Sequence, residues 1–175
     1  MMNTLPADDK ALRDLAAQLG SLLAAQHLRL ALAESCTGGW VSKALTDIAG
    51  SSAWLDQAVV TYSNEAKQTR LGVQAATLEA HGAVSRQTAA EMAAGVLLCS
   101  HADLAVAVTG IAGPGGAVPG KPVGTVWFAW ARRGAWLETA CERFPGDRES
   151  VRRASVAAAL AGLRERLLQR PDGNV

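Results

Sequence analysis

The stretch Ala33-Glu34-Ser35-Cys36-Thr37-Gly38-Gly39 decides the fold, because it joins a predicted strand to a predicted helix through a tight turn. Residues 27–33 alternate in polarity and end in small side chains, as a strand entering the protein interior does, and residues 40–45 return to helical spacing. Ser35 and Thr37 are therefore expected at the carboxyl end of a strand. Open α/β sheets bind ligands there, and the N–H groups of the following helix attract anions. The alternative is that either hydroxyl only caps the helix.

The composition is typical of a globular protein: the chain has 175 residues, of which 49% are hydrophobic and 19% charged. We expect one domain over residues 1–175, with an ordered core at about residues 7–168 and a polar tail that frays. The net charge of +1 gives no indication of a nucleic-acid or anionic-membrane partner. Cys36, Cys99 and Cys141 lack metal-binding spacing and are predicted to be reduced thiols of a cytoplasmic protein. The sequence shows no secretion signal and no apolar segment long enough to span a bilayer.

Helical and strand patterns alternate along the chain. Predicted helices cover residues 7–25, 40–48, 64–71, 78–81, 86–100 and 147–169, and predicted strands cover residues 27–33, 54–62, 102–108, 123–131 and 136–144. The last two strands form a hairpin. This order predicts the α/β class, as a three-layer α/β/α sandwich with a mixed, mostly parallel sheet. It does not predict the order of the strands.

A second loop, from Thr109 to Gly116, also combines a hydroxyl with glycines after an apolar strand. Glycine allows backbone N–H groups to approach a ligand closely, so the two loops together favour a phosphate or oxyanion cradle. The second loop lacks the Lys-Ser/Thr pair of a P-loop and opens no helix, which argues against a P-loop and a dinucleotide fingerprint. The alternative is a turn-rich connection without a binding role.

A catalytic hydroxyl needs a base. The three histidines lie before a strand, beside a turn and at a helix end, and are poorly placed. Lys67 lies just beyond a predicted strand end, together with Tyr62 and Ser63, and is within reach of Ser35. A Ser–Lys pair works if burial lowers the pKa of the amine towards neutrality; otherwise Lys67 is an ordinary solvated residue.

Three arginines, Arg148, Arg152 and Arg153, open the last predicted helix. Because a cation at a helix N-terminus opposes the helix dipole, we expect one of them to face an anion. The alternative is that all three are ordinary solvated arginines.

Four motifs carry a resemblance to a known family: Ala33-Glu34-Ser35-Cys36-Thr37-Gly38-Gly39, Thr61-Tyr62-Ser63-Asn64-Glu65-Ala66-Lys67, His81-Gly82-Ala83-Val84-Ser85, and the segment from Val108 to Gly116 followed by Lys121-Pro122-Val123-Gly124. With these motifs the chain resembles the CinA C-terminal domain family, whose stand-alone members are nicotinamide-nucleotide amidases of the PncC type. The resemblance covers about residues 7–168.

The resemblance implies a hydrolase that converts nicotinamide mononucleotide to nicotinate mononucleotide and ammonia in pyridine-nucleotide (NAD) salvage. It implies a small-molecule substrate, no cofactor, no metal, no nucleic-acid or membrane partner, and a homodimer. A non-catalytic module that binds a nucleotide or docks a partner is the alternative, but the presence of both Ser35 and Lys67 argues against it. A DNA-binding role is weak because the net charge is close to zero.

The site carried over from the resemblance has Ser35 as nucleophile and Lys67 as base, together with Tyr62. Backbone N–H groups of the glycine turns are expected to hold the oxyanion. The expected substrate-binding residues are Thr37, Gly38, Gly39, Asn64, Thr109, Gly110, Gly113, Gly115, Arg148 and Arg152.

Two departures from the family pattern stand out. Larger members have an additional N-terminal domain associated with dinucleotide pyrophosphatase activity, and we expect that activity to be absent here. Gln57-Ala58 also stands where a Gly-Gly pair is expected, which leaves the local bend of that strand open.

Overall fold

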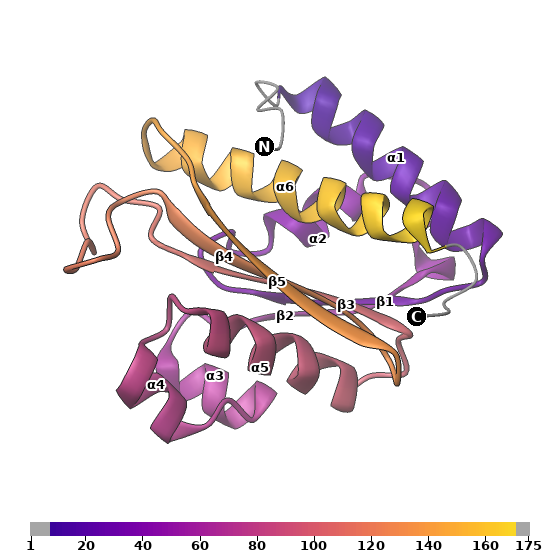
Figure 1. Ribbon diagram of the computed structural model, residues 1–175. Coiled ribbons are helices and arrows are strands. Elements are labelled where there is room, and N and C mark those ends of the chain that lie inside the picture. The colour runs from indigo at the N-terminus through magenta and orange to yellow at the C-terminus, as the bar shows by residue number, and fades with distance from the viewer. Residues whose placement is uncertain (1–7, 171–175) are drawn as a thin grey trace.

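A five-stranded sheet forms the centre of the protein, whose computed structural model describes residues 8–170 (Figure 1). The strands are β1 (Leu30–Glu34), β2 (Leu55–Val60), β3 (Leu104–Gly110), β4 (Thr125–Arg132) and β5 (Trp136–Arg143), in the spatial order β2-β1-β3-β4-β5. β1 pairs in parallel with β2 and β3, whereas β4 is antiparallel to both β3 and β5. Four strands therefore run in one direction and β4 in the other, which confirms the mixed, mostly parallel sheet. The tail predicted to fray lies largely outside the described residues.

Helices cover both faces of the sheet, so the predicted three layers are confirmed (Figure 1). One layer contains α1 (Asp9–Ala25), α2 (Trp40–Thr46) and α6 (Arg148–Gln169), and the other contains α3 (Asn64–Leu71), α4 (Ala75–His81) and α5 (Arg86–Leu98). A short 3-10 turn, η1 (Ser51–Ala53), precedes β2. Within residues 8–170, no helix is both long and apolar enough for a membrane crossing.

Capping side chains fix where several helices begin. Ser63 accepts a hydrogen bond from the N–H of Ala66, which starts α3, and Gly72 ends that helix at φ +68°. Ser85 accepts from the N–H of Thr88 and starts α5 at Arg86, where the predicted helix also begins. These caps place Lys67 in the first half of α3, directly after β2.

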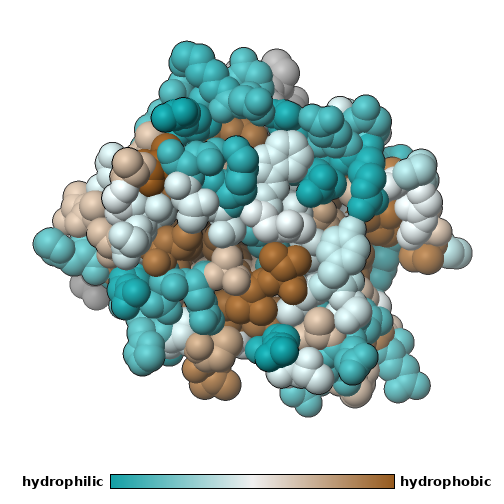
Figure 2. All heavy atoms as spheres, turned by 180° about the vertical axis from the view of Figure 1, so that it is seen from behind, coloured by the Kyte–Doolittle hydropathy of each residue, from teal (hydrophilic) through white to brown (hydrophobic). Residues whose placement is uncertain are grey.

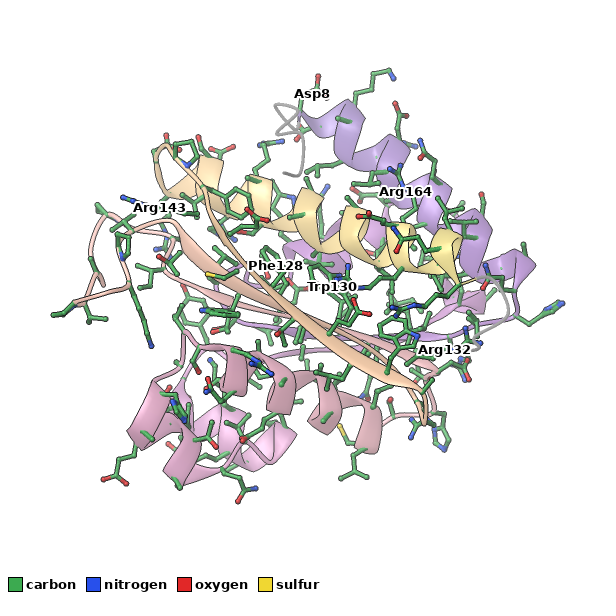
Figure 3. The ribbon with its side chains drawn as sticks, viewed as in Figure 1. Asp8, Phe128, Trp130, Arg132, Arg143 and Arg164 are labelled. Atoms are coloured by element: carbon green, nitrogen blue, oxygen red, sulfur yellow. The ribbon has the colours of Figure 1, made fainter. Side chains whose placement is uncertain are left out.

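The face of the sheet towards α6 carries the large apolar side chains. Phe128 and Trp130 of β4 point from the sheet towards this helix and stack with ring centroids 5.5 Å apart (Figure 3). The indole N–H of Trp130 donates to the carbonyl oxygen of Ala159, 2.9 Å away. Gly162 makes this approach possible, because a Cβ there would lie 2.3 Å from the Trp130 ring.

The opposite face is lined by small side chains, which allow α5 to lie close to the sheet. Ala31 and Ala33 of β1 and Ala105 and Ala107 of β3 are fully buried beneath this layer. Gly95 of α5 meets α3 so closely that a Cβ would lie 1.9 Å from the carbonyl oxygen of Leu71. This tight contact holds α3, and with it Lys67, against α5.

The carboxyl ends of β1 and β3 lie side by side at one end of the strands, because the two strands are parallel. The N–H of Ser35, just after β1, donates to the carbonyl oxygen of Val108 at 3.0 Å. The loop after β3, residues 111–124, projects from this end of the molecule, at the left of Figure 1. The two predicted loops therefore come together at the carboxyl ends of β1 and β3.

Edge strand β2 lies on the side seen in Figure 2, where apolar residues gather between hydrophilic margins. Val60 is 45% exposed and Tyr62 is 62% exposed, at the end of this strand nearest Ser35. The pairing register of β2 with β1 shifts between Leu55 and Gln57, so the strand is irregular here even without the Gly-Gly pair. The irregularity lies at the start of β2, away from Tyr62 and Lys67.

Candidate active site

Ser35 and Lys67 form the centre of the site. Lys67 is 1% exposed, and its Nζ lies 2.9 Å from the Ser35 Oγ and 2.7 Å from the carbonyl oxygen of Thr61, to which it donates. Ser35 is 9% exposed. The prediction that Lys67 reaches Ser35 is confirmed, and the alternative of a solvated Lys67 is wrong.

The surroundings of this pair favour a neutral amine. Burial lowers the pKa of Lys67 to about 8, because the charged form loses its hydration. No carboxylate among residues 8–170 forms a salt bridge with it. Burial raises the pKa of the neighbouring Cys36 thiol to about 12, so this thiol stays protonated and does not compete with Ser35 as nucleophile.

Glu34 is a buried residue beside Ser35 that the sequence analysis did not single out. It ends β1 with 1% exposure, and its carboxylate accepts four hydrogen bonds from the segment that follows. The donors are the Thr37 hydroxyl at 2.5 Å and the N–H groups of Gly39 at 3.0 Å, Val41 at 3.1 Å and Ser42 at 2.8 Å. Glu34 therefore occupies the N–H groups at the start of α2 that the sequence analysis assigned to a ligand. The available signal was an acidic residue at the end of an otherwise apolar strand.

The segment 35–39, here called the nucleophile turn, keeps two N–H groups without a protein acceptor. The N–H of Gly38 donates to the carbonyl oxygen of Ser35, and that of Gly39 to Glu34. Within the described part of the chain, the N–H groups of Cys36 and Thr37 make no such bond. Thr37 is 0% exposed and Cys36 is 7% exposed, so of these two only the N–H of Cys36, directly after Ser35, can serve as a donor to a ligand.

Arg148 joins three segments at the mouth of the site. Its guanidinium donates to the hydroxyl oxygen of Tyr62 at 2.7 Å and to the carbonyl oxygen of Gly113 at 2.8 Å. These contacts link the connection after β2, the loop after β3 and the start of α6. Arg148 is exposed, so its cation borders the solvent-facing side of the site.

The two other arginines of α6 are already engaged. Arg152 donates to the carbonyl oxygens of Cys36 and Thr37 at 3.1 and 2.9 Å. Arg153 pairs with Asp9 and Glu149, away from Ser35. Both guanidinium groups also lie near the ring of Trp40, within 5.3 and 4.9 Å of its centroid.

The remaining predicted residues fall into two groups. Thr109 is buried and donates its hydroxyl to the carbonyl oxygen of Ala83 at 2.8 Å, which ties the loop before α5 to the end of β3. Gly110 lies against the nucleophile turn, since a Cβ there would be 3.1 Å from the Cys36 Sγ. Asn64 and Gly115 are exposed, and within residues 8–170 neither makes a hydrogen bond to Ser35 or Lys67.

The comparisons with known proteins identify the family. A family model described as the CinA C-terminal domain matches residues 12–167. The chain belongs to the CinA C-terminal domain family. It is 52% identical to the nicotinamide-nucleotide amidohydrolase PncC of Escherichia coli K12 over 161 residues, which cover 92% of this chain and 98% of that protein. It is 47% identical to the protein of the same name from Pseudomonas putida, over 85% of this chain and 92% of the relative.

Other CinA relatives are longer, and several family structures are solved. The chain is 51% identical to a CinA-like protein of Akkermansia muciniphila but covers only 34% of it. A competence damage-inducible protein A from Klebsiella pneumoniae superposes with a TM-score of 0.87 at 46% identity, covering 90% of this chain and 97% of that one. A competence/damage-inducible protein from Agrobacterium tumefaciens gives a TM-score of 0.86 at 46% identity, over 92% and 97% of the two chains. The family and fold predicted from the sequence are confirmed.

Proposed function

We propose that this protein hydrolyses the carboxamide of nicotinamide mononucleotide to nicotinate mononucleotide and ammonia. The observation that carries the proposal is a buried lysine, without an anionic partner in the described chain, in contact with a serine at a strand end. The names of the relatives that cover most of the chain supply the substrate.

The pair accounts for the chemistry with this chain's residues alone. Neutral Lys67 accepts the Ser35 proton while the Oγ attacks the carboxamide carbon. The lysine then gives that proton to the departing nitrogen, so ammonia leaves and an ester on Ser35 remains. In the second half, Lys67 takes a proton from water, the resulting hydroxide attacks the ester, and Ser35 recovers its proton as nicotinate mononucleotide departs. The Thr61 carbonyl keeps the amine oriented through both halves.

The negative charge of the tetrahedral intermediate needs donors close to Ser35. The N–H of Cys36 follows the nucleophile directly and makes no backbone hydrogen bond within the described residues, and Cys36 is 7% exposed, whereas Thr37 is 0% exposed. Removing one such donor costs roughly 3–4 kcal/mol of transition-state stabilisation in comparable sites.

The 5′-phosphate of the substrate is assigned to Arg148 rather than Arg152. Arg148 is exposed at the mouth of the site, and its partners are a hydroxyl and a single carbonyl. Arg152 already donates through two nitrogens to the nucleophile turn. Tyr62, whose hydroxyl accepts from Arg148, directly follows Thr61, the partner of Lys67, and is proposed as the third side chain of the site.

Ammonia release from nicotinamide mononucleotide by the purified protein tests the proposal, with Ser35→Ala as the matched inactive variant. We expect turnover by the wild type and none above background by the variant. Binding of the nucleotide without turnover would instead support a non-catalytic nucleotide-binding module.

As further parts of the proposal, the protein is a single domain, a homodimer and a cytoplasmic enzyme of pyridine-nucleotide salvage. Light scattering after size exclusion tests the dimer.

A further inference from the structure

The nucleophile turn is held on one side by a buried acid. The Glu34 carboxylate receives the Thr37 hydroxyl and three backbone N–H groups, and within residues 8–170 it makes no salt bridge. A carboxylate at 1% exposure is tolerated only because these donors replace its water. All four donors lie in residues 37–42, so the acid fixes the turn to the end of β1.

Arg152 holds the other side of the same turn. Its guanidinium donates hydrogen bonds to the carbonyl oxygens of Cys36 and Thr37. In a trans peptide the N–H points opposite to the C=O of the same unit. The N–H of Thr37 therefore points away from Arg152. Its neighbour, the N–H of Gly38, already closes the turn on Ser35.

We propose that Glu34 and Arg152 are positioning residues, which hold the nucleophile turn from two sides and so fix Ser35 and the N–H of Cys36 in place for attack on the scissile carboxamide. The inference rests on the proposed amidase activity and assigns two residues that do not touch the reacting atoms. It also gives Arg152 a role other than binding the phosphate. A positioning role predicts a lower kcat on both substrates, whereas phosphate binding predicts a higher KM for the mononucleotide alone.

The test compares Glu34→Gln and Arg152→Met with two controls of the same chemistry at the far end of β3. Asp103→Asn removes a carboxylate that accepts the backbone N–H of Arg29, and Arg133→Met removes a guanidinium that donates to the carbonyl oxygens of Leu97, Ser100 and Ala102. The values of kcat and KM are measured on nicotinamide mononucleotide and on nicotinamide riboside, which lacks the phosphate. Hydrogen exchange of the Cys36 and Thr37 amides is followed by NMR on the free protein.

We expect Glu34→Gln and Arg152→Met to lower kcat about tenfold or more, by the same factor on both substrates, with KM changed less than about threefold. Exchange of the two amides should become at least about tenfold faster. Arg152→Lys, which keeps one donor, should recover part of the loss. The controls should keep kcat within about twofold whatever stability they lose.

Three results separate the possibilities. A rise in KM for the mononucleotide alone in Arg152→Met would assign this arginine to the phosphate and overturn the inference, as would unchanged kcat and unchanged amide exchange in both variants. A wild type that releases no ammonia would contradict the proposed function; the exchange data on the free protein then still decide whether these two side chains hold the turn. If Glu34→Gln does not fold, Arg152→Met carries the test alone, because Arg152 is only partly buried.

Discussion

The amine of Lys67 lies 2.9 Å from the hydroxyl oxygen of Ser35, and its other hydrogen-bond partner is the uncharged carbonyl of Thr61. Lysines in proteins usually face water or a carboxylate, and this one faces neither among the described residues. The contact places the Lys67 amine where it can act as the base for Ser35. Burial lowers the pKa of this amine and so favours its neutral form.

Ser35→Ala and Lys67→Ala should each reduce kcat about a thousandfold or more, because one removes the nucleophile and the other its base. The double variant should be little worse than either single one, since the two side chains act as a unit. Steady-state ammonia release measures all three. Lys43→Ala is the control, because Lys43 pairs with Asp47 on the exposed face of α2. A Lys67→Ala protein with near-wild-type kcat would make Tyr62 or a water-mediated base the next candidate.

The rate should rise with pH through the titration of Lys67. With a pKa of about 8, about one molecule in ten carries the neutral amine at pH 7. The value of kcat/KM should therefore increase nearly tenfold per pH unit below neutrality and level off above about pH 8–9. The residual activity of Lys67→Ala should lack this limb. A flat profile for the wild type between pH 6 and about 8 would contradict a lysine base.

The layers of the fold could be predicted from the sequence, because each depends on local patterns. The helices predicted to begin at residues 64 and 86 do begin there, because Ser63 and Ser85 cap them. The order of the strands could not be predicted, since no local pattern shows that β1 lies between β2 and β3. That order is what brings Lys67, after β2, to Ser35, after β1.

The side chains of the candidate site could be predicted from the sequence, but the hydrogen bonds of its backbone N–H groups could not. Ser35 and Lys67 follow strands and match family motifs, so sequence and resemblance both identified them. The sequence did not show that Glu34 and Arg152 contact the nucleophile turn, because these contacts are mainly hydrogen bonds to backbone groups. Which N–H groups remain open depends on where those bonds go. The glycines were therefore expected as oxyanion donors, whereas in the structure the N–H groups of Gly38 and Gly39 bond to Ser35 and Glu34, and the N–H of Cys36 has no acceptor among the described residues.

Arg148→Ala should raise KM for nicotinamide mononucleotide about tenfold or more and change KM for nicotinamide riboside much less, because only the former carries the phosphate. The riboside should also be the far poorer substrate of the wild type. Arg153→Ala is the matched control on the same helix, since its guanidinium pairs with Asp9 and Glu149. Equal rates on the two substrates, or an unaltered KM in Arg148→Ala, would remove Arg148 from the phosphate site.

Prolonged chelation should leave the rate unchanged. The proposed steps use a hydroxyl, an amine and backbone N–H groups, and the described residues contain no group of three or more His, Cys, Asp or Glu side chains placed to hold a metal ion. Activity is compared before and after dialysis against a chelator, and again after divalent metal is added. Loss of activity that added metal restores would defeat the metal-independent reaction.

Lys67→Met should abolish activity and change how stability depends on pH. The pKa of Lys67 is about 8 in the folded protein and close to its usual value of 10.5 when unfolded. Between these values the unfolded state binds more protons, so this group makes the folded state relatively more stable as pH rises through that window. Below about pH 8 the full cost of burying the amine is present, and above about pH 10.5 it is gone. Methionine keeps the length and apolar volume of the side chain but does not titrate. Urea unfolding at pH 7 and pH 10 should therefore show the free energy of unfolding of the wild type rising relative to that of Lys67→Met, while other titrating groups affect both proteins equally. Parallel pH dependences in the two proteins would mean that Lys67 has an ordinary pKa in the folded state, and the Ser–Lys mechanism would lose its base.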